Sequence, residues 1–248
     1  MQHLMRSVCV TLVLMTIPAC GGNPDPQTIL DKALAAHGGR EVLSQFPAIT
    51  IHFQGIQSTH GLDSPLTGTT VALGSDKSKT TIQLDVVGRK TTVTNVVVGD
   101  KGWIRDDKIT RDMTPDELAE AKEQAHAAWV SRLFPLQDPQ YTLTPLESIT
   151  VDDKPAWGVQ VSRAGYRPIK LYFDQQTGLL AKVETRVRDE NSPHEVNEET
   201  ILSQYTDVQN TRQPMRLLVK RNGQMVMDVV IKEVKLAAAV DEKTFAKP

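Results

Sequence analysis

The histidines are the first side chains in this sequence whose type could do chemistry, as metal ligands or as general acids and bases. His194 and Glu195 are similar to the start of a zinc-protease helix, but position 198 is Glu rather than a second His. The other histidines are scattered, and His37 stands where a cation suits the end of a helix. We therefore expect surface histidines, with neither a metal site nor a cofactor.

Nucleophiles and paired carboxylates are the next candidates. The sequence contains no G-x-S-x-G elbow, no G-x-G-x-x-G loop and no P-loop lysine. Acidic pairs such as Asp106–Asp107 and Asp152–Asp153 fall in turn-like segments, where solvated carboxylates are the ordinary case. No two of them have a spacing that predicts acid–base catalysis across a cleft. We expect no enzyme, and a hydrolase that uses scattered carboxylates is the least favoured alternative.

Both cysteines lie within the first 20 residues. Cys9 belongs to the apolar run Val8–Ile17, which follows Arg6 and is about half as long as the roughly 20 residues that a membrane-spanning helix needs. This pattern is typical of a secretory signal peptide. The run leads into Ile17-Pro18-Ala19-Cys20, which resembles a bacterial lipobox, with an aliphatic residue three positions before the cysteine that receives the lipid.

The lipobox divides the chain into a signal peptide at 1–19, a flexible tether at 20–26 and a folded domain at 27–248. Acyl chains on Cys20 would hold the protein to a membrane. The alternative is an ordinary signal peptide cut after Ala19, which leaves Cys20 as a free thiol. Either cleavage exports the chain. Because Gly21 is not acidic, we favour the periplasmic side of the outer membrane over the inner membrane.

Composition limits the function further. The chain has 248 residues, of which 40% are hydrophobic and 23% charged, as expected for a globular protein. Its net charge of −2 argues against nucleic acid as a partner, because such proteins carry a basic face. No cysteine follows Cys20, so the exported domain, which we expect to be a monomer, has to be stable without disulfides.

The first predicted helix starts at Asp25–Pro26, where an N-cap aspartate precedes a proline at the first helical position. It ends at Gly38–Gly39, and a short helical piece at 40–45 follows. Between these ends, apolar residues recur at helical spacing, which predicts one buried stripe.

The second predicted helix covers 114–134. It starts with a capping box, Thr114-Pro115-Asp116-Glu117, in which the Thr and Glu side chains each accept a hydrogen bond from the other residue's backbone N–H. Trp129 and Leu133 are expected on its apolar side, whereas Glu120 and Glu123 are expected to face outward.

The rest of the chain consists of apolar or alternating runs separated by turn signals about ten residues apart, which is typical of consecutive antiparallel strands. Asn222–Gly223 is the strongest hairpin signal, because a type I′ turn needs a positive φ at both central positions. The predicted fold class is mainly β with α insertions, a curved antiparallel half-barrel of about 11–13 strands with helices covering the concave face. The predicted strands lie at 48–54, 66–73, 79–87, 90–98, 102–105, 108–111, 141–150, 156–162, 169–173, 179–187, 196–205, 215–220 and 225–234.

Two interpretations of the concave face stay open. The helices fill it as an ordinary core, or they leave an aliphatic cavity suited to acyl chains. If a ligand enters, the predicted lining residues are Leu84, Val96, Trp129, Leu133, Phe173 and Leu180.

Three segments carry a resemblance to a known family. Ala36-His37-Gly38-Gly39 with Leu43, the hairpin Leu171–Leu180 and the ending Phe245–Pro248 resemble the LolA/LolB-like class of bacterial outer-membrane lipoprotein-sorting proteins. The stretch Thr114–Pro135 is similar to bacterial lipoproteins of the planctomycete type. These are turn and capping motifs, which indicate the fold more strongly than the activity.

The resemblance implies a curved half-barrel plugged by helices, and it implies binding of a lipid or lipoprotein acyl chain with transfer between membranes. Two features differ from the soluble carrier of that class, namely the predicted lipid anchor and an aromatic content of only 5%. The favoured hypothesis is a lipid-anchored envelope protein, a carrier or acceptor, that binds an acyl chain without catalysis. The alternative is an envelope scaffold with a filled cavity and a protein partner at its edge strands.

Overall fold

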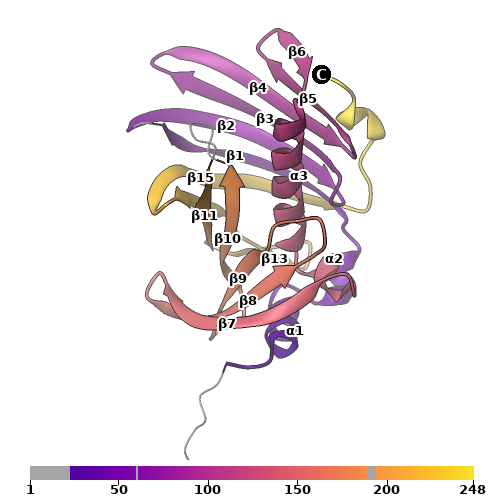
Figure 1. Cartoon of the computed structure of the whole chain (residues 1–248), viewed down its shortest axis with the longest axis vertical. Coiled ribbons are helices and arrows are strands. Elements are labelled where there is room, and N and C mark those ends of the chain that lie inside the picture. The colour runs from indigo at the N-terminus through magenta and orange to yellow at the C-terminus, as the bar shows by residue number, and fades with distance from the viewer. Residues whose placement is uncertain (1–22, 60, 189–193) are drawn as a thin grey trace, which may run out of the picture.

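The computed structural model describes residues 23–59, 61–188 and 194–248 (Figure 1). The predicted signal peptide, the lipobox and Cys20 lie outside the described residues. No helix within the described residues is both long and apolar enough to span a membrane.

One antiparallel sheet of 13 strands forms the body of the molecule, in the order β6-β5-β4-β3-β2-β1-β15-β14-β11-β10-β9-β8-β7. The sheet curls without closing, which confirms the predicted half-barrel (Figure 1). A separate hairpin, β12–β13, follows β11. The strands are β1 (Ala48–Thr59), β2 (Leu62–Leu73), β3 (Lys77–Val86), β4 (Arg89–Val98), β5 (Lys101–Asp106), β6 (Ile109–Asp112), β7 (Thr142–Val151), β8 (Lys154–Ser162), β9 (Ile169–Asp174), β10 (Leu180–Arg188), β11 (Glu195–Ser203), β12 (Thr206–Val208), β13 (Thr211–Gln213), β14 (Arg216–Arg221) and β15 (Gln224–Ala237).

The chain order explains the shape. Strands β1 to β6 are added one after another toward one edge, and β7 to β11, β14 and β15 return from the opposite edge to the centre. There β15 pairs with β1, with Ala48 opposite Ala237. The hairpin β14–β15 turns at Asn222 and Gly223, whose φ angles of 47° and 80° confirm the predicted turn.

Helix α3 (Pro115–Val130) follows the edge strand β6 and leads through the 3-10 helix η1 (Phe134–Gln137) to the other edge strand, β7. It lies across the concave side of the sheet and contacts both β4 and β10 (Figure 1). The predicted capping box is present, since Thr114 and Glu117 each accept the other's backbone N–H. The helix ends earlier than predicted, because Leu133 has a φ of 66° and so leaves the helical path.

Helix α1 (Pro26–Ala36) starts where Asp25 accepts the N–H groups of Gln27 and Thr28, as predicted. It packs against β7 and β8, and the short α2 (Arg40–Ser44) follows it. Near the C-terminus, the 3-10 helix η2 (Glu242–Phe245) packs against β3 and β4.

The main hydrophobic core lies between α1, η1 and strands β8 to β10. Its buried members come from both helices and the sheet, and Phe173, Ile29 and Leu30 among them are exposed by only 1%. They include Ile29, Leu30, Ala33, Leu34, Val130, Leu133, Val159, Val161, Ile169, Leu171, Phe173 and Leu180.

The segment before α1 is held against the sheet. The Asn23 side chain donates to the carbonyl of Leu146 in β7 at 2.7 Å, and its carbonyl oxygen accepts from the Ser148 hydroxyl at 2.7 Å. Asn23, which the sequence places within a flexible tether at 20–26, is therefore in contact with β7.

Candidate functional site

A cavity of about 470 Å³ lies between α3 and the sheet. This volume is within the range of roughly 300–1,000 Å³ that small-molecule sites occupy. Its sheet wall comes from β1, β10, β11, β14 and β15, and His37 and Leu43 add to it from the N-terminal helices. Apolar members of the wall include Leu43, Ile51, Leu180, Val183, Val187, Leu202, Leu217, Val219, Ile231 and Val234.

The stripe of α3 that faces this cavity is polar or small. Positions 120, 123, 124, 127, 128 and 131 all line the cavity, and their spacing places them on one face of a helix. The six residues are Glu120, Glu123, Gln124, Ala127, Ala128 and Ser131. Short side chains leave the space open, which is why a cavity exists beneath this helix.

Along the neighbouring strands β11 and β14, the residues of the sheet wall change from apolar to charged. Leu202 in β11 lies opposite Leu217 in β14, and the next cavity-facing pair in the same strands is Thr200 with Val219. The pair after that is Glu198 with Arg221, whose side chains form an ion pair of 2.8 Å. The wall therefore suits an amphipathic molecule better than a purely aliphatic one.

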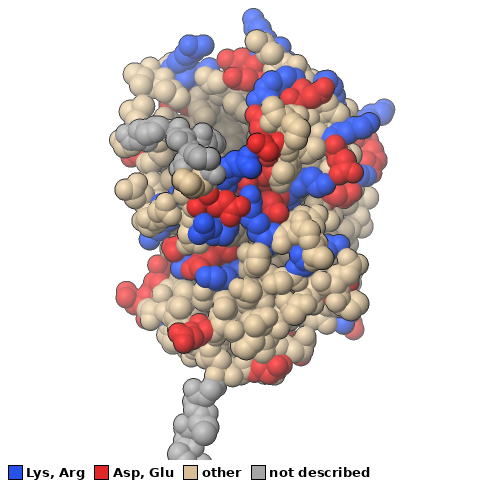
Figure 2. Space-filling view, in the orientation of Figure 1, with Lys and Arg blue, Asp and Glu red and all other residues tan. Residues whose placement is uncertain are grey.

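Arg167, in the loop between β8 and β9, holds a group of carboxylates beside α3. Its guanidinium pairs with Glu120 at 2.8 Å and with Glu195 at 2.7 Å, and its backbone N–H donates to Glu123. Burial raises the pKa of Glu123. Figure 2 shows intermixed positive and negative side chains across the middle of the face it presents, next to a hollow. The expectation that Glu120 and Glu123 face outward is wrong, because Arg167 compensates their charge on the cavity side.

His37 closes the end of the cavity beside α1. Its Nδ1 lies 2.8 Å from the carbonyl of Ala33, which fixes Nδ1 as the donor, and Nε2 accepts the N–H of Leu180 at 3.5 Å. Burial, opposed by the bond to Ala33, lowers the pKa of His37. The neutral ring therefore joins α1 to β10 through its two hydrogen bonds. The expectation of a surface cation at His37 is wrong.

Gly38 allows the hairpin β12–β13 to cover the same end. It has a φ of +114°, and a Cβ there would meet the carbonyl oxygen of Asn210. The N–H of Arg212 donates to the carbonyl of His37 at 3.1 Å, which ties the hairpin to the end of α1. The sequence predicted one strand over 196–205 and missed this hairpin, because β12 and β13 are only three residues each.

His126 is buried between two tyrosines on the other side of α3. Its ring stacks on Tyr166 with centroids 3.8 Å apart and lies 5.8 Å from Tyr141. Burial, helped by the charge of Arg163, lowers its pKa to about 4. This histidine also differs from the surface position expected. Within the ranges that the structure describes, no three His, Cys, Asp or Glu side chains are grouped so that they could hold a metal ion.

Arg132 lines the cavity just beyond the end of α3. It donates to the carbonyl of Pro47 at 3.0 Å and to the carbonyl of Phe46, in the loop before β1. The guanidinium carbon lies 5.7 Å from the Trp129 ring and 5.3 Å from the Phe134 ring. Burial lowers the pKa of Arg132 to about 10.

Of the six lining residues predicted from sequence, Leu180 lies on the cavity wall. Leu133 and Phe173 belong to the packed core beside α1, and the Trp129 ring lies against the Phe134 ring and the Arg132 guanidinium. Val96 is fully buried in β4, and Leu84 is half-buried opposite Leu66 in β2. The structure does not bring these six residues together.

Sequence reasoning missed most of the cavity, although two signals were present. The alternation of Glu198, Thr200 and Leu202 marks one face of a strand that is half polar. The small or polar residues at 120, 123, 124, 127, 128 and 131 mark a helix face that cannot fill a core.

Comparison with solved structures shows that the chain has the fold of the LolA superfamily. A LolA superfamily protein from Nitrosomonas europaea aligns with a TM-score of 0.55 at 14% identity, over 90% of this chain and 97% of that chain. An outer membrane lipoprotein-sorting protein domain from Vibrio parahaemolyticus aligns with a TM-score of 0.54 at 11% identity, over 89% and 95% of the two chains.

A DUF1329 family protein from Desulfovibrio piger aligns with a TM-score of 0.54 at 12% identity, over 89% of this chain and 97% of that chain. No protein-family model and no curated protein sequence matches the chain. The likeness therefore defines the architecture, and the activity has to be argued from the site.

Proposed function

We propose that this protein binds an aliphatic chain of a lipid or a lipoprotein in the cavity under α3, without catalysing a reaction on it. The observation that carries the proposal is the open cavity, whose wall passes from leucines and valines to the Glu198–Arg221 pair. An aliphatic chain would cover the apolar wall, and a polar head group would lie at the charged side. The LolA-like fold, which includes a lipoprotein-sorting domain among its solved examples, supports this choice.

We also propose that the protein acts in the bacterial cell envelope. The lipobox at Ile17–Cys20 supports lipidation of Cys20 and attachment to a membrane on the periplasmic side, with the outer membrane favoured. The alternative function, a scaffold that binds a protein partner, predicts a cavity filled by the helices. The open volume beneath α3 favours the ligand-binding function over this alternative.

The test uses the exported chain with Cys20→Ser, which cannot be lipidated. Displacement of the uncharged fluorescent probe N-phenylnaphthylamine would report occupation of the cavity, and mass spectrometry of an organic extract would identify any co-purified lipid. We expect Val219→Trp, on the cavity wall, to weaken probe binding by about tenfold or more. Lys220→Trp changes the next residue of β14, outside the cavity lining, and is expected to leave probe binding unchanged.

The result that contradicts the proposal is a wild-type protein that yields no lipid and binds neither the probe nor any aliphatic competitor. A specific protein partner recovered from envelope extracts, together with that result, would favour the scaffold. Turnover in ester or glycoside screens would contradict the absence of catalysis.

A further inference from the structure

Five arginines line the cavity, and four of them are paired with carboxylates. Arg132 is the exception, since none of the carboxylates that the structure describes forms an ion pair with it. The pairs are Arg167 with Glu120 and Glu195 at 2.8 and 2.7 Å, Arg186 with Glu195 at 3.8 Å, Arg212 with Asp207 at 3.3 Å, and Arg221 with Glu198 at 2.8 Å.

Among the described residues around Arg132, none supplies a countercharge. Its two described hydrogen bonds go to neutral carbonyls, of Phe46 and Pro47, and its neighbours include the Trp129 and Phe134 rings. A guanidinium has five N–H donors, so three of them are free of these two bonds. A desolvated cation without a partner is costly, and its pKa is lowered by burial for that reason.

A purely structural role accounts for only part of this arrangement. The two bonds to the loop at Phe46–Pro47 hold the end of α3 over β1, and a cation there also suits the end of a helix. Neutral hydrogen-bond donors would hold the same loop without the cost of a buried charge. The charge is useful where an anion comes to the cavity.

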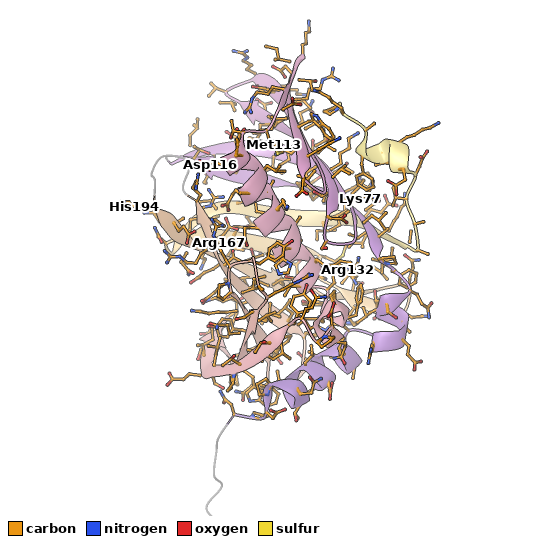
Figure 3. The ribbon with its side chains drawn as sticks, turned by 45° about the vertical axis from the view of Figure 1, so that its right-hand side comes forward. Lys77, Met113, Asp116, Arg132, Arg167 and His194 are labelled. Carbon is orange, nitrogen blue, oxygen red and sulfur yellow. The ribbon has the colours of Figure 1, made fainter. Side chains whose placement is uncertain are left out.

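The apolar wall begins next to Arg132. The loop that accepts its hydrogen bonds leads directly into β1, in which Ile51 lines the cavity opposite Val234 of β15. Arg132 and Arg167 lie on opposite sides of α3 (Figure 3). An anion would be repelled by Glu120, Glu123 and Glu195 on the Arg167 side and attracted on the Arg132 side.

We propose that the cavity selects an acidic amphiphile, whose carboxylate or phosphate head group pairs with Arg132 and whose aliphatic chain lies along Ile51 and Val234. This inference rests on the proposed lipid-binding function and names the chemistry of the ligand. The planar fork of Arg matches the two oxygens of a carboxylate or a phosphate, so both head groups are covered by the same recognition.

The first experiment compares head groups on one chain length in the Cys20→Ser protein. Hexadecanoate, hexadecyl phosphate and hexadecanol compete with N-phenylnaphthylamine, and their dissociation constants are measured at low salt and neutral pH. We expect one or both acids to bind about tenfold or more tightly than the alcohol. Tighter binding of hexadecanoate would identify a carboxylate head group, and tighter binding of hexadecyl phosphate would identify a phosphate head group. Equal binding of all three overturns the inference and leaves the proposed function intact, whereas binding of none of them, together with no probe binding and no co-purified lipid, overturns both.

The second experiment assigns the preference to Arg132. Arg132→Met is expected to abolish the acid-to-alcohol ratio while the alcohol still binds, and Arg132→Lys is expected to retain part of it. Arg40→Met removes a nearby guanidinium outside the cavity lining, and its ratio should equal that of the wild type. If Arg132 only held the loop at Phe46–Pro47, its substitution would weaken the acids and the alcohol alike and leave the acid-to-alcohol ratio unchanged. Retention of the full ratio in Arg132→Met overturns the inference, and the wild-type series stands as the test if that variant does not fold.

Discussion

The same sheet packs solidly beside α1 and leaves a cavity beneath α3. Helix α1 presents Ile29, Leu30, Ala33 and Leu34 to strands β8 to β10, and all four are buried. Helix α3 presents glutamate, glutamine, alanine and serine to strands β10, β11, β14 and β15. The strands present apolar residues in both places, joined under α3 by the Glu198–Arg221 pair, so the helix side chains decide whether the space is filled. A LolA-like half-barrel can thus be solid at one end and hollow at the other.

Truncation of a leucine should separate the two regions most strongly. Leu171→Ala removes a fully buried side chain of the core beside α1, and we expect it to lower the free energy of unfolding by about 2–5 kcal/mol. Leu217→Ala makes the same chemical change on the cavity wall, where no new void has to be created, and should cost about 1 kcal/mol. Urea unfolding followed by circular dichroism measures both. Equal losses would contradict the hollow region.

Enlargement of a valine should act in the opposite sense. Val161→Phe adds volume to the packed core, and we expect a loss of about 1–3 kcal/mol in stability. Val219→Phe adds the same volume to the cavity, where the ring has space, and should be neutral or stabilising while probe binding falls. Thermal unfolding and probe displacement on the two variants give the comparison. A destabilised Val219→Phe would show that the wall cannot accept the ring.

Loss of a helix cap should have a smaller effect. Thr114→Ala on α3 and Asp25→Ala on α1 each remove an N-cap and should cost about 1 kcal/mol. Of these two helices, α3 covers the length of the cavity, so Thr114→Ala should speed release of N-phenylnaphthylamine more than Asp25→Ala does, as measured by stopped-flow dilution. Equally faster release from both variants would mean that α1 also controls entry.

The smallest effect at neutral pH is expected of His126→Phe. Burial lowers the pKa of His126 from the ordinary 6.5 to about 4, so the unfolded chain binds the proton more readily than the folded chain. The contribution of the neutral His126 ring to stability is fully present above about pH 6.5 and is lost as the pH is lowered toward 4. His126→Phe keeps the stacking on Tyr166 and should flatten this fall. Part of the fall should stay, because His37 titrates in the same direction. Identical pH profiles would contradict the buried neutral ring.

Local signals in the sequence predicted the local structure well. Asp25, Thr114 with Glu117, and Asn222–Gly223 each act within a few residues, and each forms the cap or turn that was expected. The half-barrel and its range of strand numbers followed from the spacing of such turns. Leu133 is the counterexample, since it was assigned to α3 on apolar periodicity and instead has a positive φ beyond the helix end.

The cavity could not be predicted in the same way, because it depends on which elements meet across the sheet. The direction in which Glu120 points is decided by Arg167, which is 47 positions later in the chain. Burial of His37 depends on Leu180 and on the hairpin β12–β13, both distant in sequence. The predicted lining residues were chosen for being apolar, and apolar residues on a well-covered strand enter the solid core first. Phe173 did so.

The attachment of Asn23 to β7 limits how far the protein could travel. Only three peptide steps separate Asn23 from Cys20, so an extended chain reaches at most about 11 Å. If Cys20 carries the lipid, the link between the lipid and the half-barrel is shorter than helix α1, and the half-barrel stays close to its membrane. Under the proposed function, such a protein would accept a lipid that is brought to its membrane and would not carry one between membranes.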